Sequence, residues 1–140
     1  MHDYLVLRVI SKLLLPFIFM YALYVQFHGD FGPGGGFQAG MIFASGFILY
    51  VLIYGIANAE AVLPRGILRF GFSAGVLLYG GVGVHNLLVG GNFLDYSVMR
   101  ADPVAGQHLG ITLIELGVGI TVASVMVTVF YTFAGRGRRR

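Results

Sequence analysis

Four long apolar stretches alternate with short polar or glycine-rich segments along the whole chain. They cover approximately residues 4–27, 37–59, 67–89 and 106–133. Each stretch has about the 20 residues that a helix needs to cross the hydrocarbon core of a bilayer. The segments between them carry the Gly, Pro and charged residues that are typical of turns. The pattern therefore predicts an all-α membrane protein, built as a bundle of about four transmembrane helices in a single transmembrane domain, 1–140.

The composition supports insertion into a lipid bilayer. Hydrophobic residues make up 57% of the chain and charged residues 11%, whereas a soluble domain carries about 25% charged residues. The absence of cysteine excludes disulfides, thiolate nucleophiles and Cys-ligated clusters within this chain. The basic cluster that begins at Arg136 directly follows an apolar stretch. It is typical of an anchor at the membrane surface, and no nucleic acid is expected as a partner.

The basic residues predict the orientation, because Lys and Arg concentrate in cytoplasmic loops near helix ends. With four spans and the N-terminus inside, both termini are cytoplasmic. Only Arg100 then lies outside. We also expect the first stretch to be retained as a helix, because no small-residue cleavage site follows it. The remaining basic residues fall on the inner side: Arg8, Lys12, Arg65, Arg69, Arg136, Arg138, Arg139 and Arg140.

The segment between the first two apolar stretches has an unusual sequence, with Pro33 followed by Gly34, Gly35 and Gly36. Proline interrupts a helix, and glycine adopts backbone conformations that other residues cannot adopt cheaply. We interpret the segment as a shaped turn. Backbone amides at the start of the second helix could face an anion, a water or a partner's carboxylate. A tight hairpin that only links two packed helices is the alternative.

Glu115 is the one carboxylate that the pattern places well inside a predicted span. An ionisable group at such a depth usually faces the bundle interior or a partner. His108 and Thr112 share its helical face, at the i, i+4, i+7 spacing. One interpretation is a segment of a proton or cation relay. In the other, a neighbouring subunit neutralises the carboxylate, which then serves assembly.

Other polar residues give weaker signals. Glu60 lies beside Arg65 in a short inner loop and is expected to be a solvated or paired charge. Glycine pairs such as Gly71 with Gly75, and Gly106 with Gly110, have the spacing that lets helices approach closely. Histidines near the span ends would permit haem or metal binding only if they faced one another. We expect no catalytic residue, cofactor or metal in this chain.

The stretch from Tyr24 to Gly40 contains the pattern HG, then PGGGFQ and AG. It resembles the signature of the MnhB/MrpB family, which are small membrane subunits of the Mrp-type, or Mnh-type, sodium/proton antiporters. The four-helix layout of the whole chain is similar to that family's. The positions that match the family motif are His28, Gly29, Pro33, Gly34, Gly35, Gly36 and Phe37.

The resemblance implies a small subunit of a hetero-oligomeric antiporter in the bacterial plasma membrane. Such an assembly exchanges Na+ for H+, and its large subunits carry the principal pumping machinery. This subunit would support assembly and partly line an ion path, with the other subunits and the lipid bilayer as its partners. One alternative is an ion-translocating membrane subunit of a redox complex such as a membrane-bound hydrogenase. Another is a haem protein with two histidine ligands.

Overall fold

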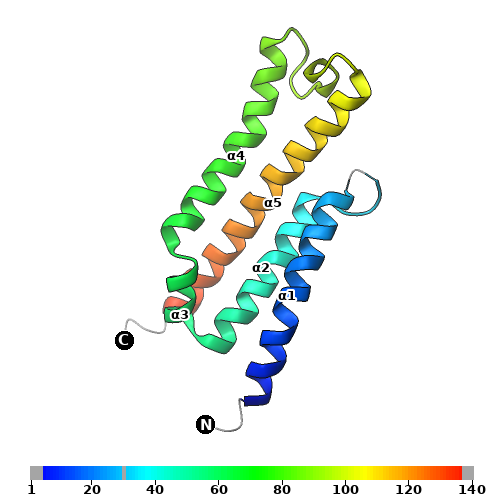
Figure 1. Ribbon diagram of the computed structural model, residues 1–140. Helices are drawn as coiled ribbons and strands as arrows, with labels where there is room; N and C mark the ends of the chain where they lie inside the picture. Colours follow the sequence, from blue (N-terminus) through cyan, green and yellow to red (C-terminus); the bar gives the residue numbers. More distant parts are fainter. Residues whose placement is uncertain (1–4, 30, 137–140) are drawn as a thin grey trace.

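The computed structural model describes residues 5–29 and 31–136, which form helices joined by short connections (Figure 1). Four helices are long and apolar enough to cross a membrane. This confirms the prediction of an all-α protein with four membrane-capable helices. Asp30 and the last three arginines lie outside the described residues. The elements in chain order are α1 (Leu5–His28), α2 (Gly36–Tyr54), α3 (Ile56–Val62), α4 (Arg65–Leu88), the 3-10 helix η1 (Tyr96–Met99) and α5 (Pro103–Gly135).

Helix α5 lies in the middle of the bundle, between α4 on one side and the α1–α2 pair on the other (Figure 1). Helix α1 packs mainly on α2, while α2 and α4 both pack on α5. Helix α1 begins and α5 ends at the same end of the bundle (Figure 1). The arrangement is the one required if both termini lie on the same side of the membrane.

Glycines allow the helix backbones to approach α5 closely. A Cβ atom on Gly40 of α2 would lie 2.7 Å from the carbonyl oxygen of Gly119. A Cβ atom on Gly75 of α4 would lie 2.5 Å from the carbonyl oxygen of Gly117. Real Cβ contacts are not this short, so side chains at these positions would force the helices apart. Gly75 therefore allows the close approach that its spacing predicts, and the helix that it contacts is α5.

The glycine pair near the start of α5 has a different neighbour. Gly106 lies against the backbone of η1, and Gly110 lies against the ring of Tyr96. The connection between α4 and α5 therefore folds back onto α5 and covers these two glycines. Another helix does not occupy that face, although the spacing favours one.

The second apolar stretch is interrupted near its C-terminal end, in contrast to the predicted continuous helix over 37–59. Helix α2 ends at Tyr54, and Gly55 then adopts φ 86°, in the left-handed region that favours glycine. A separate short helix, α3, follows before Pro64 and the start of α4. The apolar composition continues through the break, so hydropathy alone cannot reveal it.

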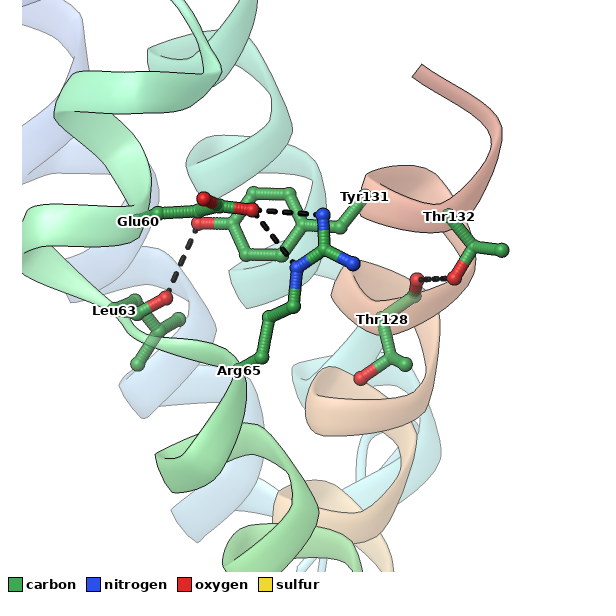
Figure 2. Close-up of polar contacts among 6 residues, drawn as sticks. All are labelled: Glu60, Leu63, Arg65, Thr128, Tyr131 and Thr132. Carbon is green, nitrogen blue, oxygen red and sulfur yellow. Dashed lines mark hydrogen bonds and ion pairs between the residues drawn. The ribbon is translucent and has the colours of Figure 1, made fainter. Parts of the chain in front are cut away.

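Buried apolar side chains from α2, α3, α4 and α5 meet at the end of the bundle that contains α3. Tyr131 of α5 is central there and is only 1% exposed. Its hydroxyl donates a hydrogen bond to the carbonyl oxygen of Leu63 at 3.2 Å (Figure 2). Arg65 forms an ion pair with Glu60 at 2.8 Å and lies over the Tyr131 ring. The prediction of a solvated or paired Glu60 is confirmed.

The α1–α2 connection contacts α5 well away from the N-terminal end of that helix. Gly36, the first residue of α2, lies against the backbone of Glu115. Glu115 is twelve residues after Pro103, or about 18 Å along the helix axis at about 1.5 Å per residue. With 33 residues, α5 is about 50 Å long, whereas the hydrocarbon core is about 30 Å thick. The connection therefore meets α5 about a third of the way along its length.

Candidate functional site

The connection between α1 and α2, which we call the glycine loop (residues 29 and 31–35), folds back onto the last turn of α1. The amides of Phe31 and Gly32 donate to the carbonyl oxygen of His28 at 3.0 and 3.1 Å. The amide of Gly35 donates to the carbonyl oxygen of Val25 at 3.1 Å. These bonds satisfy carbonyl groups that a helix end leaves unpaired. They also hold both ends of the loop against the same helix.

Glycine is required at the end of this loop for two reasons. Gly35 adopts φ 116° and ψ 176°, a region that is essentially restricted to glycine. Gly36 is buried, and a Cβ atom there would overlap the carbonyl oxygen of Glu115. The first turn of α2 therefore rests directly on the backbone of α5.

The carboxylate of Glu115 packs against bare backbone of the glycine loop. A Cβ atom on Gly29 would lie 2.5 Å from Oε1 and 2.7 Å from Oε2 of Glu115. A Cβ atom on Gly35 would lie 3.0 Å from Oε1. The Glu115 residue itself is half-buried. Two features that the sequence singles out separately, the glycine motif and the carboxylate inside a span, thus form one site.

His108 and Thr112 lie on α5 between Glu115 and the start of the helix, and both are exposed. The Thr112 hydroxyl donates to the carbonyl oxygen of His108 at 2.8 Å. The His108 ring stacks on Phe31 of the glycine loop, with 6.2 Å between ring centroids. The three residues share one face as the spacing predicts. The hydroxyl proton of Thr112 is bound within its own helix, so only its oxygen is available to a neighbour.

The other motif residues lie around the loop and do not all face Glu115. His28 stacks on Tyr24 one turn earlier, with 5.1 Å between ring centroids. Its Nε2 atom lies 3.1 Å from the position of a Cβ atom on Gly32. Pro33 is exposed, and Phe37 is 62% exposed. Gly29 and Gly35 face the carboxylate. Gly34 packs on the carbonyl oxygen of Val25, while Phe37 faces the surroundings of the bundle.

Two buried amide side chains carry no motif signal. Gln26 is 8% exposed, and its Oε1 atom lies 2.5 Å from the position of a Cβ atom on Gly119. Asn86 is completely buried, and neither of its side-chain polar atoms has a partner among residues 5–29 and 31–136. Only their polarity within apolar stretches could have drawn attention to them. In the same described residues, no group of three His, Asp or Glu side chains could hold a metal ion.

The four long apolar helices define a small multi-pass membrane protein. Residues 6–128 match the family described as a domain related to the MnhB subunit of the Na+/H+ antiporter, and the chain belongs to this family. It is a small multi-pass subunit of the bacterial plasma membrane. The family likeness stated from the motif is confirmed.

Similar proteins occur in Staphylococcus aureus strains Newman, JH1 and Mu3. Each is named as a proposed antiporter subunit, mnhB2. Each is 35% identical to this chain over 133 residues, which are 93% of this chain and 94% of the relative. The likeness therefore covers all four membrane-capable helices and the glycine loop. These matches do not favour the redox-complex alternative.

Proposed function

We propose that this subunit supports the assembly of a monovalent cation/proton antiporter and lines part of its ion path at Glu115. The observation that carries the proposal is the contact between the Glu115 carboxylate and the backbone of Gly29 and Gly35. Among the described residues of the loop, the positions that the carboxylate oxygens approach most closely are both glycines. On that side, an ion held by the carboxylate would meet loop backbone rather than the side chains of Gly29 and Gly35.

The depth of the site supports a role in transport. Glu115 is four residues from Gly119, the midpoint of α5, or about 6 Å along the axis. Carboxylates at such depths are costly and usually serve ion or proton pathways, or pair with a partner. Irregular backbone is tolerated at membrane depth only where protein covers it or where it lines a water-filled space. The glycine loop meets this condition if the complex provides a water-filled entrance above it.

The polar face of α5 supplies a route from the outer end to the carboxylate. His108 and Thr112 are exposed on the part of α5 that extends beyond the glycine loop. Within the antiporter, a neighbouring subunit would close this face into an entrance for H+ or Na+. Glu115 would exchange the proton, with His108 near the mouth. Other antiporter subunits and the lipid bilayer are the partners that this arrangement requires.

An assembly role for Glu115 alone is the competing proposal, in which a basic or hydroxyl group of a neighbouring subunit neutralises the carboxylate. Both roles use the same contacts with the glycine loop. They differ in what happens when the charge is removed and the shape is retained. A carboxylate that only holds a partner affects the amount of complex, while a carboxylate in the path affects turnover of the assembled complex.

Glu115→Gln in the complete antiporter complex distinguishes these roles. The measurements are the yield of all subunits that co-purify with this chain and the Na+-dependent proton exchange of membrane vesicles. We expect a normal yield and exchange reduced to background. Glu60→Gln is the matched control, because Glu60 pairs with Arg65 at the exposed α3 end of the bundle, and it should transport normally. Normal exchange by Glu115→Gln would exclude the path role, and loss of the complex would favour the assembly role.

A further inference from the structure

An apolar groove runs along the bundle between α1 and α4. Its volume is about 320 Å³, and residues of α2 and α5 form its floor. On α5 it extends from Leu116 to Val127, eleven residues or about 16 Å at about 1.5 Å per residue. This length corresponds to about three turns of a helix. The groove lies beside the level of Glu115 at one end and reaches Leu63 at the other.

The floor of the groove consists largely of small residues. Ala39 and Gly40 contribute from α2, and Gly119 and Ala123 contribute from α5. Small residues on a helix face let the backbone of another helix approach closely within a membrane. A floor of this kind is therefore compatible with a helix as the occupant, but by itself it does not distinguish a helix from a lipid chain.

Two polar side chains in the groove make that distinction. Gln26 and Ser124 both line it, each is 8% exposed, and neither side chain forms a hydrogen bond with another described residue. The Thr128 hydroxyl donates to the backbone carbonyl oxygen of Ser124 at 2.7 Å, a bond that does not involve the Ser124 hydroxyl. An unpaired amide in an apolar environment is costly. The chain of a lipid offers no hydrogen-bonding group, whereas a protein helix can present one.

We propose that this groove receives a transmembrane helix from another subunit of the antiporter. The helix would turn small residues toward the floor and place a hydroxyl or amide side chain against Gln26. The proposal rests on the proposed function, because it needs the complex that the family membership implies. It goes further by assigning one face of this subunit to one kind of partner.

Cross-linking in the complete complex tests the proposal directly. Leu23 and Ile67 line opposite walls of the groove, on α1 and α4. A photoreactive benzophenone side chain is placed at each position in turn and activated in the native membrane. The control is Leu77, which is 73% exposed and lies nine residues from the buried Leu68 on α4, on the opposite face. Mass spectrometry then identifies the cross-linked segment.

The proposal predicts that both walls cross-link to the same transmembrane segment of the same partner subunit, and that Leu77 does not. Products with phospholipid, or with a second copy of this chain, from both walls would overturn it. These outcomes are separable from a failure of the proposed function. If no antiporter subunits co-purify at all, the proposed function fails. If they co-purify and the groove cross-links to lipid, only the groove proposal fails.

Filling the groove provides a second test. Ala123 lies on the floor and is half-buried, so the larger side chain of Ala123→Phe has room within this chain and occupies the place of the partner helix. Val125 is 40% exposed two residues away, about 200° around the helix, and Val125→Phe is the matched control. We expect only Ala123→Phe to lose the cross-linked subunit and to abolish the wall cross-links. Retention of that subunit with unchanged cross-links would overturn the proposal.

Discussion

Glycine residues make the contact between the loop and Glu115 possible, and Gly29 and Gly35 do so for different reasons. Gly29 does not adopt a positive φ, and it is small because the carboxylate and the Gly35 Cα atom occupy the space of a Cβ. Gly35 has both a close carboxylate oxygen and a positive φ. Substitution at Gly35 therefore combines backbone strain with pressure on Glu115, and these two effects can be separated by a suitable control.

Gly55 is that control, because it adopts φ 86° and has nothing within 4 Å of a Cβ position. Gly35→Ala and Gly55→Ala should each lower the free energy of unfolding by about 1 to 3 kcal/mol through strain. Only Gly35→Ala should also reduce antiport per assembled complex, because it displaces the Glu115 carboxylate. Thermal unfolding in detergent and vesicle exchange give the two readouts. Equal antiport by the two variants would show that the loop contact does not serve transport.

Tyr96 in η1 covers Gly110 of α5, and its burial has an electrostatic consequence. Burial raises the pKa of the Tyr96 phenol above its ordinary value of 10.0, and the neighbouring Tyr79 adds to the increase. The folded state therefore favours the neutral phenol. The stabilisation is fully present below about pH 10 and is lost as the pH rises through the higher pKa of the folded state.

Tyr96→Phe retains the ring and removes the ionisable group. We expect the wild-type protein to lose thermal stability above pH 10 to a greater extent than Tyr96→Phe does, with little difference between them at pH 7. The measurement is the unfolding temperature of both proteins as a function of pH. Parallel curves over the alkaline range would contradict the burial of this phenol.

At the scale of elements, the sequence predicts the membrane-capable helices well because the length of an apolar stretch is a direct physical requirement of the bilayer. The length of the apolar stretch does not predict the helix break at Gly55, because apolar residues continue on both sides of it. Apolar length does not predict the short helix η1 either. Its position depends on the packing of Tyr96 against Gly110, a contact that hydropathy does not describe.

In the candidate site, too, the sequence shows the individual residues but not the contact between them. The glycine motif and the isolated carboxylate are both visible in the sequence, but Gly35 and Glu115 are 80 residues apart. Their contact depends on where α2 meets α5, and that register is set by close approaches such as Gly40 to Gly119. A single sequence does not encode this register in any local pattern. Gln26 remains inconspicuous for a related reason, because its burial results from the packing of α1 beside α5.

The connection between α3 and α4 is held by one buried contact and one exposed contact. Tyr131→Phe removes the hydrogen bond to Leu63 and should cost about 0.5 to 1.5 kcal/mol of unfolding free energy. Glu60→Gln breaks an ion pair whose side chains are 36% and 54% exposed, and should cost less than about 1 kcal/mol. Tyr131→Ala should cost about 3 to 5 kcal/mol by leaving a cavity. Thermal unfolding of the purified variants ranks them, and a larger effect of Glu60→Gln than of Tyr131→Ala would contradict this account.

At the scale of the whole molecule, the described basic residues divide between the two ends of the bundle. Arg8 lies near the start of α1, Arg65 starts α4, and Arg136 follows α5, at the end that also contains α3 (Figure 1). Arg100 lies beside η1 at the other end. The distribution agrees with the positive-inside rule if the α3 end is cytoplasmic. The glycine loop and the exposed face of His108 are then on the route from the outside.

Single cysteines test this orientation, because the chain contains none of its own. Ser97→Cys in η1 should react in intact cells with a maleimide that cannot cross the membrane. Arg136→Cys should react only after the membrane is opened. Val125→Cys, in the middle of the apolar part of α5, should react in neither case and serves as the control. The reverse pattern would place the glycine loop on the cytoplasmic route, and Glu115 would then receive its ion from the inside.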